Sequence, residues 1–170
     1  LRRTDLVAQI GSLKRSHNQE SFSLRPSREA MIIRRLVARH SGPFPVAALV
    51  RLWRELLSGQ VMVQSEFNVA LFEPSAEPKY RSIARDQFSA AARVHLLPSP
   101  AQVIHAVSSD NLTVGVLPLP SDEHPDPWWA TLSDEGNILI RIVARLPFLR
   151  ERTDAMLNNE ALVVAKVTPE

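Results

Sequence analysis

The chain contains no cysteine among its 170 residues. This absence excludes disulfide bonds, thiolate catalysis and cysteine-based metal sites together. It suits the reducing environment of the cytoplasm, where we expect the protein to reside. No apolar run approaches the roughly 18 residues that a membrane span needs, and no signal peptide is visible. With 45% hydrophobic and 22% charged residues, the composition is that of a soluble globular protein.

The formal net charge is only +2, which by itself is too small to indicate nucleic acid as a partner. Arginines crowd the first quarter of the chain, and most of them are interpreted as a solvated basic surface. They fall on different helix faces without interleaved aromatics, so nucleic-acid binding is a weak alternative. We expect neither nucleic acid nor a membrane as a partner. The scattered His95, His105 and His124 lack carboxylates at metal-ligand spacing, so no metal site is expected.

A change of composition near residue 66 divides the chain into two predicted parts. Helical periodicity dominates the first part, and breaker residues separate its helices. Ser27 is a plausible N-cap with Pro26 just outside the helix, and Pro45 opens the last helix. Leu6, Ile10 and Leu13 form an apolar stripe on the first helix. The helices are expected over 3–14, 27–39 and 45–64.

From residue 67 onward, short strands alternate with short helices. Such alternation predicts an α/β layer with parallel strand pairing. The strands are expected at 67–72, 94–97, 112–117, 138–146 and 161–167, and the helices at 80–92, 100–107 and 128–132. The pair Trp128–Trp129 is interpreted as packing against the sheet, with a ligand platform as the alternative. The predicted fold is α+β overall, with an all-helical domain over 1–66 and a small α/β lobe over 67–170.

Polar side chains occupy positions of the third predicted helix where a core is expected. At about 100° per residue, Gln60 and Gln64 fall on the same face as the apolar Leu49, Trp53 and Leu56. A buried amide without hydrogen-bond partners costs on the order of 1–3 kcal/mol. These two amides therefore need partners, which a bound ligand can supply.

Cationic residues recur at helical spacing in the first predicted helix. Arg3 and Lys14 are eleven residues apart, close to three turns, so they share one face at a separation of about 16 Å along the axis. The second helix carries Arg28 and Glu29 at its start. Together with the amides, these cations predict a pocket for a small polyanion. Taken singly, each residue also has an ordinary alternative role, such as a surface ion pair or a helix cap.

The order and spacing of these residues resemble the all-helical, AroQ-type chorismate mutase family. The resemblance is carried by RRTDLVAQIGSLK over 2–14, by Arg28-Glu29-Ala30, and by Gln64 at the end of the third helix. It implies conversion of chorismate to prephenate, a pericyclic isomerisation in the shikimate route to phenylalanine and tyrosine. It also implies an intertwined homodimer and no metal or organic cofactor.

The resemblance assigns a role to each site residue. The catalytic residues would be Lys14 and Gln64, which donate hydrogen bonds to the ether oxygen of the substrate. Arg3 would grip a substrate carboxylate, and Glu29 would accept a hydrogen bond from the substrate hydroxyl. The substrate-binding residues implied are Arg3, Arg28, Glu29 and Gln60.

Two positions depart from the pattern of the family. Arg25 stands in place of an aspartate, and Gln60 in place of a serine. A further substrate-binding arginine, which in the family enters the site of the partner subunit, would precede Leu1. Because the chain begins with Leu rather than Met, we expect the first helix to be incomplete. These departures leave a non-catalytic or regulatory binding module for an aromatic-pathway acid as the alternative function.

Residues 67–166 resemble, more weakly, the first lobe of the prephenate dehydratase catalytic domain. The traces of that lobe lie at 67–72, 82–88, 115–119 and 128–132. The glycine-rich turn of the family reads EPSAEP over 73–78, which lacks the glycines that let a backbone approach an anion. Its Pro-x-Glu-Asn segment reads PLPS over 118–121. We therefore expect no dehydratase activity and a lobe that serves stability, dimer contacts or regulation.

Overall fold

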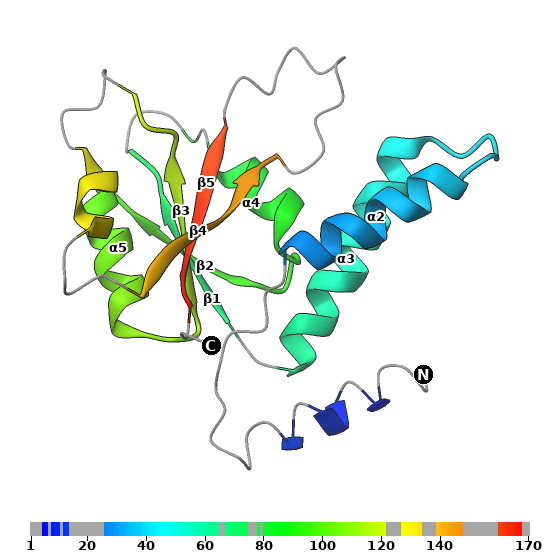
Figure 1. Cartoon of the computed structure of the whole chain (residues 1–170), viewed down its shortest axis with the longest axis horizontal. Helices are drawn as coiled ribbons and strands as arrows, with labels where there is room; N and C mark the ends of the chain where they lie inside the picture. The colour runs from blue at the N-terminus through cyan, green and yellow to red at the C-terminus, as the bar shows by residue number, and fades with distance from the viewer. Residues whose placement is uncertain are drawn as a thin grey trace.

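The chain folds into a helical hairpin followed by a five-stranded sheet that carries helices on both faces (Figure 1). The computed structural model describes residues 5–6, 8–10, 12–13, 26–64, 67–74, 78, 80–121, 127–133, 139–147 and 160–167. The predicted α+β class is confirmed. Near the N-terminus, residues 5–6, 8–10 and 12–13 are helical, as expected.

Helices α2 (Pro26–Arg39) and α3 (Val46–Gln64) form the hairpin. Its core consists of the buried Ile33, Val50 and Leu57, with Ile32, Val37 and Trp53 packed around them. In the turn between the helices, the ring Nε2 of His40 lies 2.6 Å from the carbonyl oxygen of Phe44. The carbonyl of Pro45 accepts the first hydrogen bond of α3, from the N–H of Leu49 at 3.0 Å.

Two expectations for the helices need correction. Pro26 belongs to α2 rather than preceding it, in a first-turn position where a missing N–H costs nothing. Leu56, predicted on the inward face of its helix, is 55% exposed, because the buried face of α3 follows Val50, Leu57 and Ser58. The predicted apolar stripe of Leu6, Ile10 and Leu13 is exposed, at 58%, 46% and 61%.

The sheet is mixed, with the strand order β2-β1-β3-β5-β4. The strands are β1 (Asn68–Phe72), β2 (Arg93–Leu97), β3 (Thr113–Pro118), β4 (Ile140–Leu146) and β5 (Ala161–Lys166). Strand β1 pairs in parallel with β2 and β3, as predicted. Strand β5 is antiparallel to both β3 and β4, so the prediction of parallel pairing is wrong for this half of the sheet.

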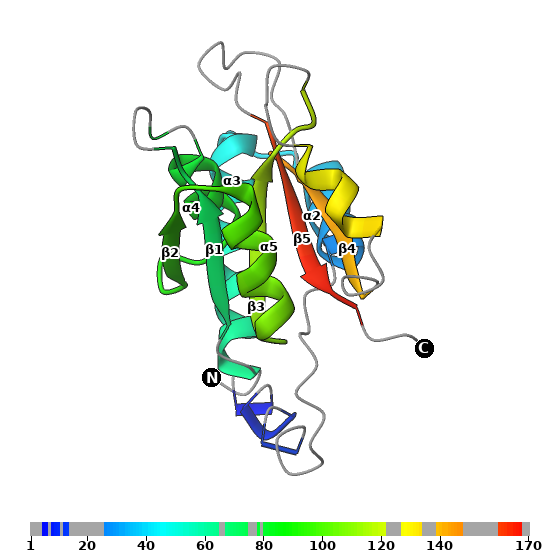
Figure 2. The same ribbon diagram turned by 90° about the vertical axis from the view of Figure 1, so that its left-hand side faces the viewer.

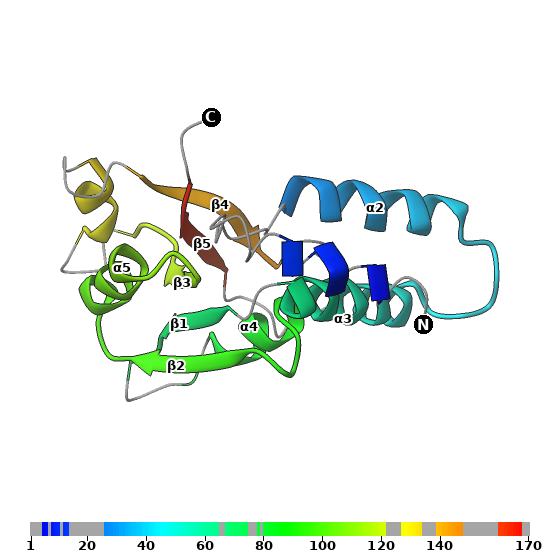
Figure 3. The same ribbon diagram turned by 90° about the horizontal axis from the view of Figure 1, so that it is seen from below.

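Helices cover the two faces of the sheet from opposite sides. Helix α5 (Pro100–Ser109) and the 3-10 helix η1 (Trp128–Ser133) lie on one face, and α4 (Arg81–Gln87) lies on the other, next to α3 (Figures 1 and 2). Seen from below, the hairpin extends from the α4 side of the sheet (Figure 3). None of the helices in the described part of the chain is both long and apolar enough to cross a membrane.

Helix α4 is shorter than the predicted 80–92. It ends at Gln87, and the next residue, Phe88, has extended backbone angles (φ −101°, ψ 140°). The Phe88 side chain is buried and packs edge-on against Phe67, with ring centroids 5.9 Å apart. Insertion of this ring into the core redirects the chain, so the residues after it turn toward α3 instead of continuing the helix.

The central strands are buried on both faces, as strands between two helical layers must be. Val69, Leu71, Val114 and Val116 belong to the core on the α4 side of the sheet. Ala70, Phe72 and Leu117 belong to the core on the α5 side. Trp128 is only 2% exposed and lies in the second core with its neighbour Trp129 against it, which confirms the packing interpretation of this pair.

Gly115 lies where α5 approaches the middle of the sheet most closely. A Cβ atom at this position would lie 2.7 Å from a methyl carbon of Val164 and 2.8 Å from one of Val103. Real Cβ contacts are longer, so a side chain here would push the helix away from the sheet. By contrast, a Cβ atom at Gly59 in α3 would meet nothing within 4 Å.

We predict that Gly115→Ala lowers the free energy of unfolding by about 1–3 kcal/mol, the usual cost of overpacking a core. Gly59→Ala is the matched control and should raise the free energy of unfolding by up to about 1 kcal/mol, because alanine is the better helix former. Urea unfolding followed by far-ultraviolet circular dichroism measures both. Equal effects of the two substitutions would contradict the close packing of α5 on β3.

Candidate functional site

The expected site residues divide into two groups. Arg3 and Lys14 lie outside the described residues. The other four lie on the hairpin: Arg28 and Glu29 in the first turn of α2, and Gln60 and Gln64 near the end of α3. Among these four, Arg28 is exposed and the other three are partly buried.

The hairpin geometry sets where these polar groups lie. Helices α2 and α3 run in opposite directions, so the beginning of α2 lies beside the later half of α3 (Figure 1). Helix α3 has 19 residues and α2 has 14, and α3 extends past the beginning of α2 toward the sheet. Carboxylate and amide groups are therefore presented from the same end of the hairpin.

Arg54 is a further charged residue at this end, and sequence reasoning did not single it out. Burial raises the pKa of Glu29 above the ordinary glutamate value of 4.5, and the positive charge of Arg54 opposes that rise. Burial likewise lowers the pKa of Arg54, while the charges of Asp86 and Glu29 oppose the decrease. The Nε and Nη2 atoms of Arg54 are buried without a hydrogen-bond partner. Arg54 thus interacts electrostatically with two carboxylates and has unused hydrogen-bond donors.

A sequence signal for Arg54 did exist. Arg54 follows Val50 by four residues and precedes Leu57 by three, so it lies on the buried stripe of α3. A cation on a buried stripe is costly unless it is paired.

Helix α3 is also hydrogen-bonded to the turn that follows α4. The backbone N–H of Ser89 donates to the hydroxyl oxygen of Ser58 at 2.7 Å. The hydroxyl of Ser89 donates to Oε1 of Glu55 at 2.7 Å, and the N–H of Ala90 donates to the same oxygen at 3.2 Å. Helix α3 therefore carries candidate site residues and also anchors the sheet.

The chemistry of the described site groups suits binding and orientation. The two amides can donate hydrogen bonds, the carboxylate of Glu29 can accept one, and the guanidinium of Arg54 supplies positive charge. Such a set can hold an anionic molecule that carries a hydroxyl group. In the part of the chain that the structure covers, no group of three or more His, Asp or Glu side chains could hold a metal ion.

We predict that Glu29→Gln gains stability relative to the wild type as the pH rises above 4.5. The pKa of Glu29 is raised in the folded protein, so the folded state binds the proton more tightly than the unfolded state does. Wild-type stability therefore falls as the pH rises from 4.5 through the folded-state pKa. Glutamine has no such titration. Urea unfolding of both proteins across this range measures the difference, and a difference that does not change with pH would contradict the burial of this carboxyl.

Comparison with known protein families gives a match over the first part of the chain. Residues 1–65 match the family model described as chorismate mutase type II. This range contains α2 and α3 with all four described site residues. Comparisons with curated proteins and with solved structures gave no significant match.

The match agrees with the resemblance that the sequence motifs carry, and it ends one residue after α3. Residues 66–170 lie outside it, and no family model identifies the sheet and its helices. Residues 1–65 are therefore similar to the type II chorismate mutase family.

Proposed function

We propose that the protein is a chorismate mutase that isomerises chorismate to prephenate in aromatic amino acid biosynthesis. The observation that carries this proposal is the family match over residues 1–65. Within that match, the amide and carboxylate residues expected of the family stand at one end of the hairpin formed by α2 and α3.

The reaction needs binding groups rather than a nucleophile. Chorismate is a dicarboxylate, and its rearrangement is unimolecular, with no proton transfer and no covalent intermediate. The enzyme must hold a compact conformer and stabilise the charge that grows on the ether oxygen. Arginine forks suit carboxylates because they can bond both oxygens at once.

The roles of individual residues follow from this requirement. We assign Lys14 and Gln64 as the donors to the ether oxygen and Arg3 as the carboxylate ligand. Glu29 accepts a hydrogen bond from the substrate hydroxyl. Arg54 supports that role, because its positive charge opposes the effect of burial on the Glu29 carboxylate. The remaining substrate-binding residues in this assignment are Arg28 and Gln60.

We further propose that the active form is a homodimer. The exposed stripe of Leu6, Ile10 and Leu13 supports this, because a second copy can cover it. The α/β lobe after residue 66 is proposed to be non-catalytic. Its sequence lacks the glycine-rich turn and the Pro-x-Glu-Asn segment of the prephenate dehydratase lobe that it weakly resembles. Light scattering of the purified protein tests the dimer directly.

We predict that Gln64→Ala lowers kcat by about 10²–10³-fold, the usual effect of removing one donor to a developing negative charge. The assay follows the loss of chorismate absorbance with the full-length protein. Gln102→Ala is the matched control, because Gln102 is an exposed glutamine on α5 and its loss should leave turnover unchanged. Normal turnover by the Gln64 variant would contradict the site assignment. No turnover by the folded wild type would favour the non-catalytic binding module.

We predict that Lys14→Ala lowers kcat by a similar factor and also raises KM. In the proposed assignment, Lys14 donates a hydrogen bond to the ether oxygen and is also near a carboxylate of the substrate. Lys14→Arg, which keeps the charge but changes the shape of the donor, should recover part of the KM effect and little of kcat. Steady-state kinetics separates the two constants. An unchanged kcat for Lys14→Ala would contradict its role at the ether oxygen.

A further inference from the structure

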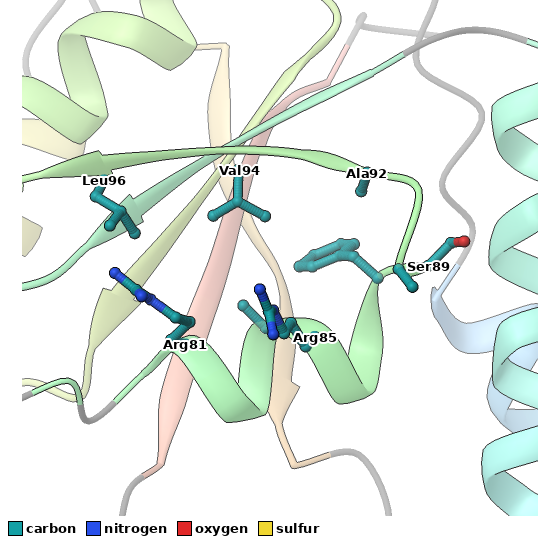
Figure 4. Close-up of a pocket in the computed structure, with 9 residues that line it drawn as sticks. Arg81, Arg85, Ser89, Ala92, Val94 and Leu96 are labelled. Carbon is teal, nitrogen blue, oxygen red and sulfur yellow. The ribbon is translucent and has the colours of Figure 1, made fainter.

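A cavity of about 330 Å³ lies between α4 and the edge strand β2 and reaches the turn that follows α4 (Figure 4). Its volume falls at the lower end of the range for small-molecule sites, about 300–1,000 Å³. The lining residues come from α4, from the turn after it and from β2, and they are Arg81, Ala84, Arg85, Phe88, Ser89, Ala90, Ala92, Val94 and Leu96.

The charged side of this cavity is cationic. Arg81 and Arg85 are four residues apart on α4, so they share one face, and both side chains extend from the helix toward β2 (Figure 4). Arg81 Nη2 lies 3.4 Å from Oε1 of Glu73, whereas Arg85 has no ion-pair partner in the described part of the chain. Among the residues that the structure describes, no acidic side chain lines the cavity. The site therefore carries a positive charge that nothing in its lining neutralises.

The rest of the lining is mainly apolar. Phe88 and Ala84 line the cavity and are buried, and Val94 and Leu96 face α4 from the strand (Figure 4). Leu96 is 44% exposed, so a large part of this apolar side chain is accessible to a ligand. A ligand that covers Leu96 would gain about 25 cal/mol per Å² of apolar surface buried.

We propose that this cavity binds a small organic carboxylate with an apolar body. The carboxylate would accept hydrogen bonds from Arg85, and from Arg81 where its Glu73 partner leaves donors free. The apolar body would lie on Phe88, Val94 and Leu96. An inorganic anion would leave the apolar side uncovered, and an uncharged apolar molecule would leave Arg85 unpaired, so neither matches both sides of the site.

The cavity is joined to the candidate mutase site through α3. Ser89 and Ala90 line the cavity, and the same two residues donate hydrogen bonds to Glu55 and Ser58 of α3. Asp86, beside Arg85 on α4, acts electrostatically on Arg54, which in turn acts on Glu29. An occupant that shifts α4 against β2 would therefore shift groups on α3. Control of mutase turnover by this ligand rests on the proposed function, whereas binding itself does not.

The first experiment measures binding without any reference to turnover. 3-Phenylpropionate is titrated into the full-length protein by isothermal titration calorimetry, with 3-phenylpropan-1-ol as the uncharged analogue and inorganic phosphate as the bare anion. We expect binding of the carboxylate only. Equal binding of the alcohol, or no binding of the carboxylate at millimolar concentration, would overturn the proposal.

Variants then test the position of the site. Arg85→Gln should weaken 3-phenylpropionate binding by at least about tenfold, since a hydrogen bond to a charged group is lost. Leu96→Asp should abolish binding by placing a negative charge on the apolar side. Arg35→Gln, an exposed arginine on α2, is the matched control and should bind as the wild type does. Unchanged affinity in both Arg85→Gln and Leu96→Asp would place the ligand elsewhere and overturn the proposal.

The connection to α3 is tested separately with Glu55→Gln, which removes the charge from the anchor while leaving the cavity lining intact. In the wild type, 3-phenylpropionate should shift the amide resonances of Gln60 and Gln64 and change chorismate turnover. In Glu55→Gln it should still bind, with smaller shifts at both glutamines. Binding without any α3 response in the wild type would overturn the connection. The resonance shifts retain their meaning even if the protein shows no mutase activity.

Discussion

The hydrogen bonds from the turn after α4 to Glu55 and Ser58 are the constraint on which the rest of the arrangement depends. They join two parts of the chain that are 31 residues apart in the shortest case. Ser58 and Ser89 are both buried. Breaking the hydrogen bond between them would therefore leave a buried donor and a buried acceptor without a partner, at a cost of about 1–3 kcal/mol. The bonds fix the end of α4, and thereby the position of Phe88 in the core and of Arg85 over the cavity. They also fix α3, which carries the amides assigned to the mutase site.

The electrostatic arrangement around Arg54 follows from the same packing. Burial disfavours the charged forms of Arg54 and of Glu29, and each charge partly offsets the cost for the other. The carboxylate of Asp86 adds to this from α4. The hairpin and the α/β layer are thus held together by complementary charge as well as by hydrogen bonds and apolar contact.

Local patterns predicted most of the elements. Strands such as 67–72 and helices such as 45–64 have a clear hydrophobic periodicity and are flanked by residues that break regular structure. The end of α4 could not be predicted this way, since residues 80–92 have helical character throughout. What ends the helix is the burial of Phe88 and the bonds of Ser89 to another helix. The antiparallel pairing of β5 is also a property of the whole sheet. In the site, Glu29, Gln60 and Gln64 stand on the expected helices, whereas Arg54 was not predicted, because its electrostatic interaction with Asp86 depends on how α4 packs on α3. The roles of Arg3, Lys14, Arg28, Glu29, Gln60 and Gln64 all remain predictions.

The last two turns of α3 belong to the sheet as much as to the hairpin. Val61 and Met62 pack against the core on the α4 side of the sheet, whereas Val50 and Leu57 lie in the core of the hairpin. Only residues 65 and 66 separate this helix from Phe67, which is 1% exposed and directly precedes β1. A gene fragment that stopped at residue 66 would leave Val61 and Met62 without their packing partners, and the complementary fragment would lose part of the cover of its sheet. Recombination at this junction would therefore separate residues that share one core. Selection for a stable fold should keep the two parts together in one chain.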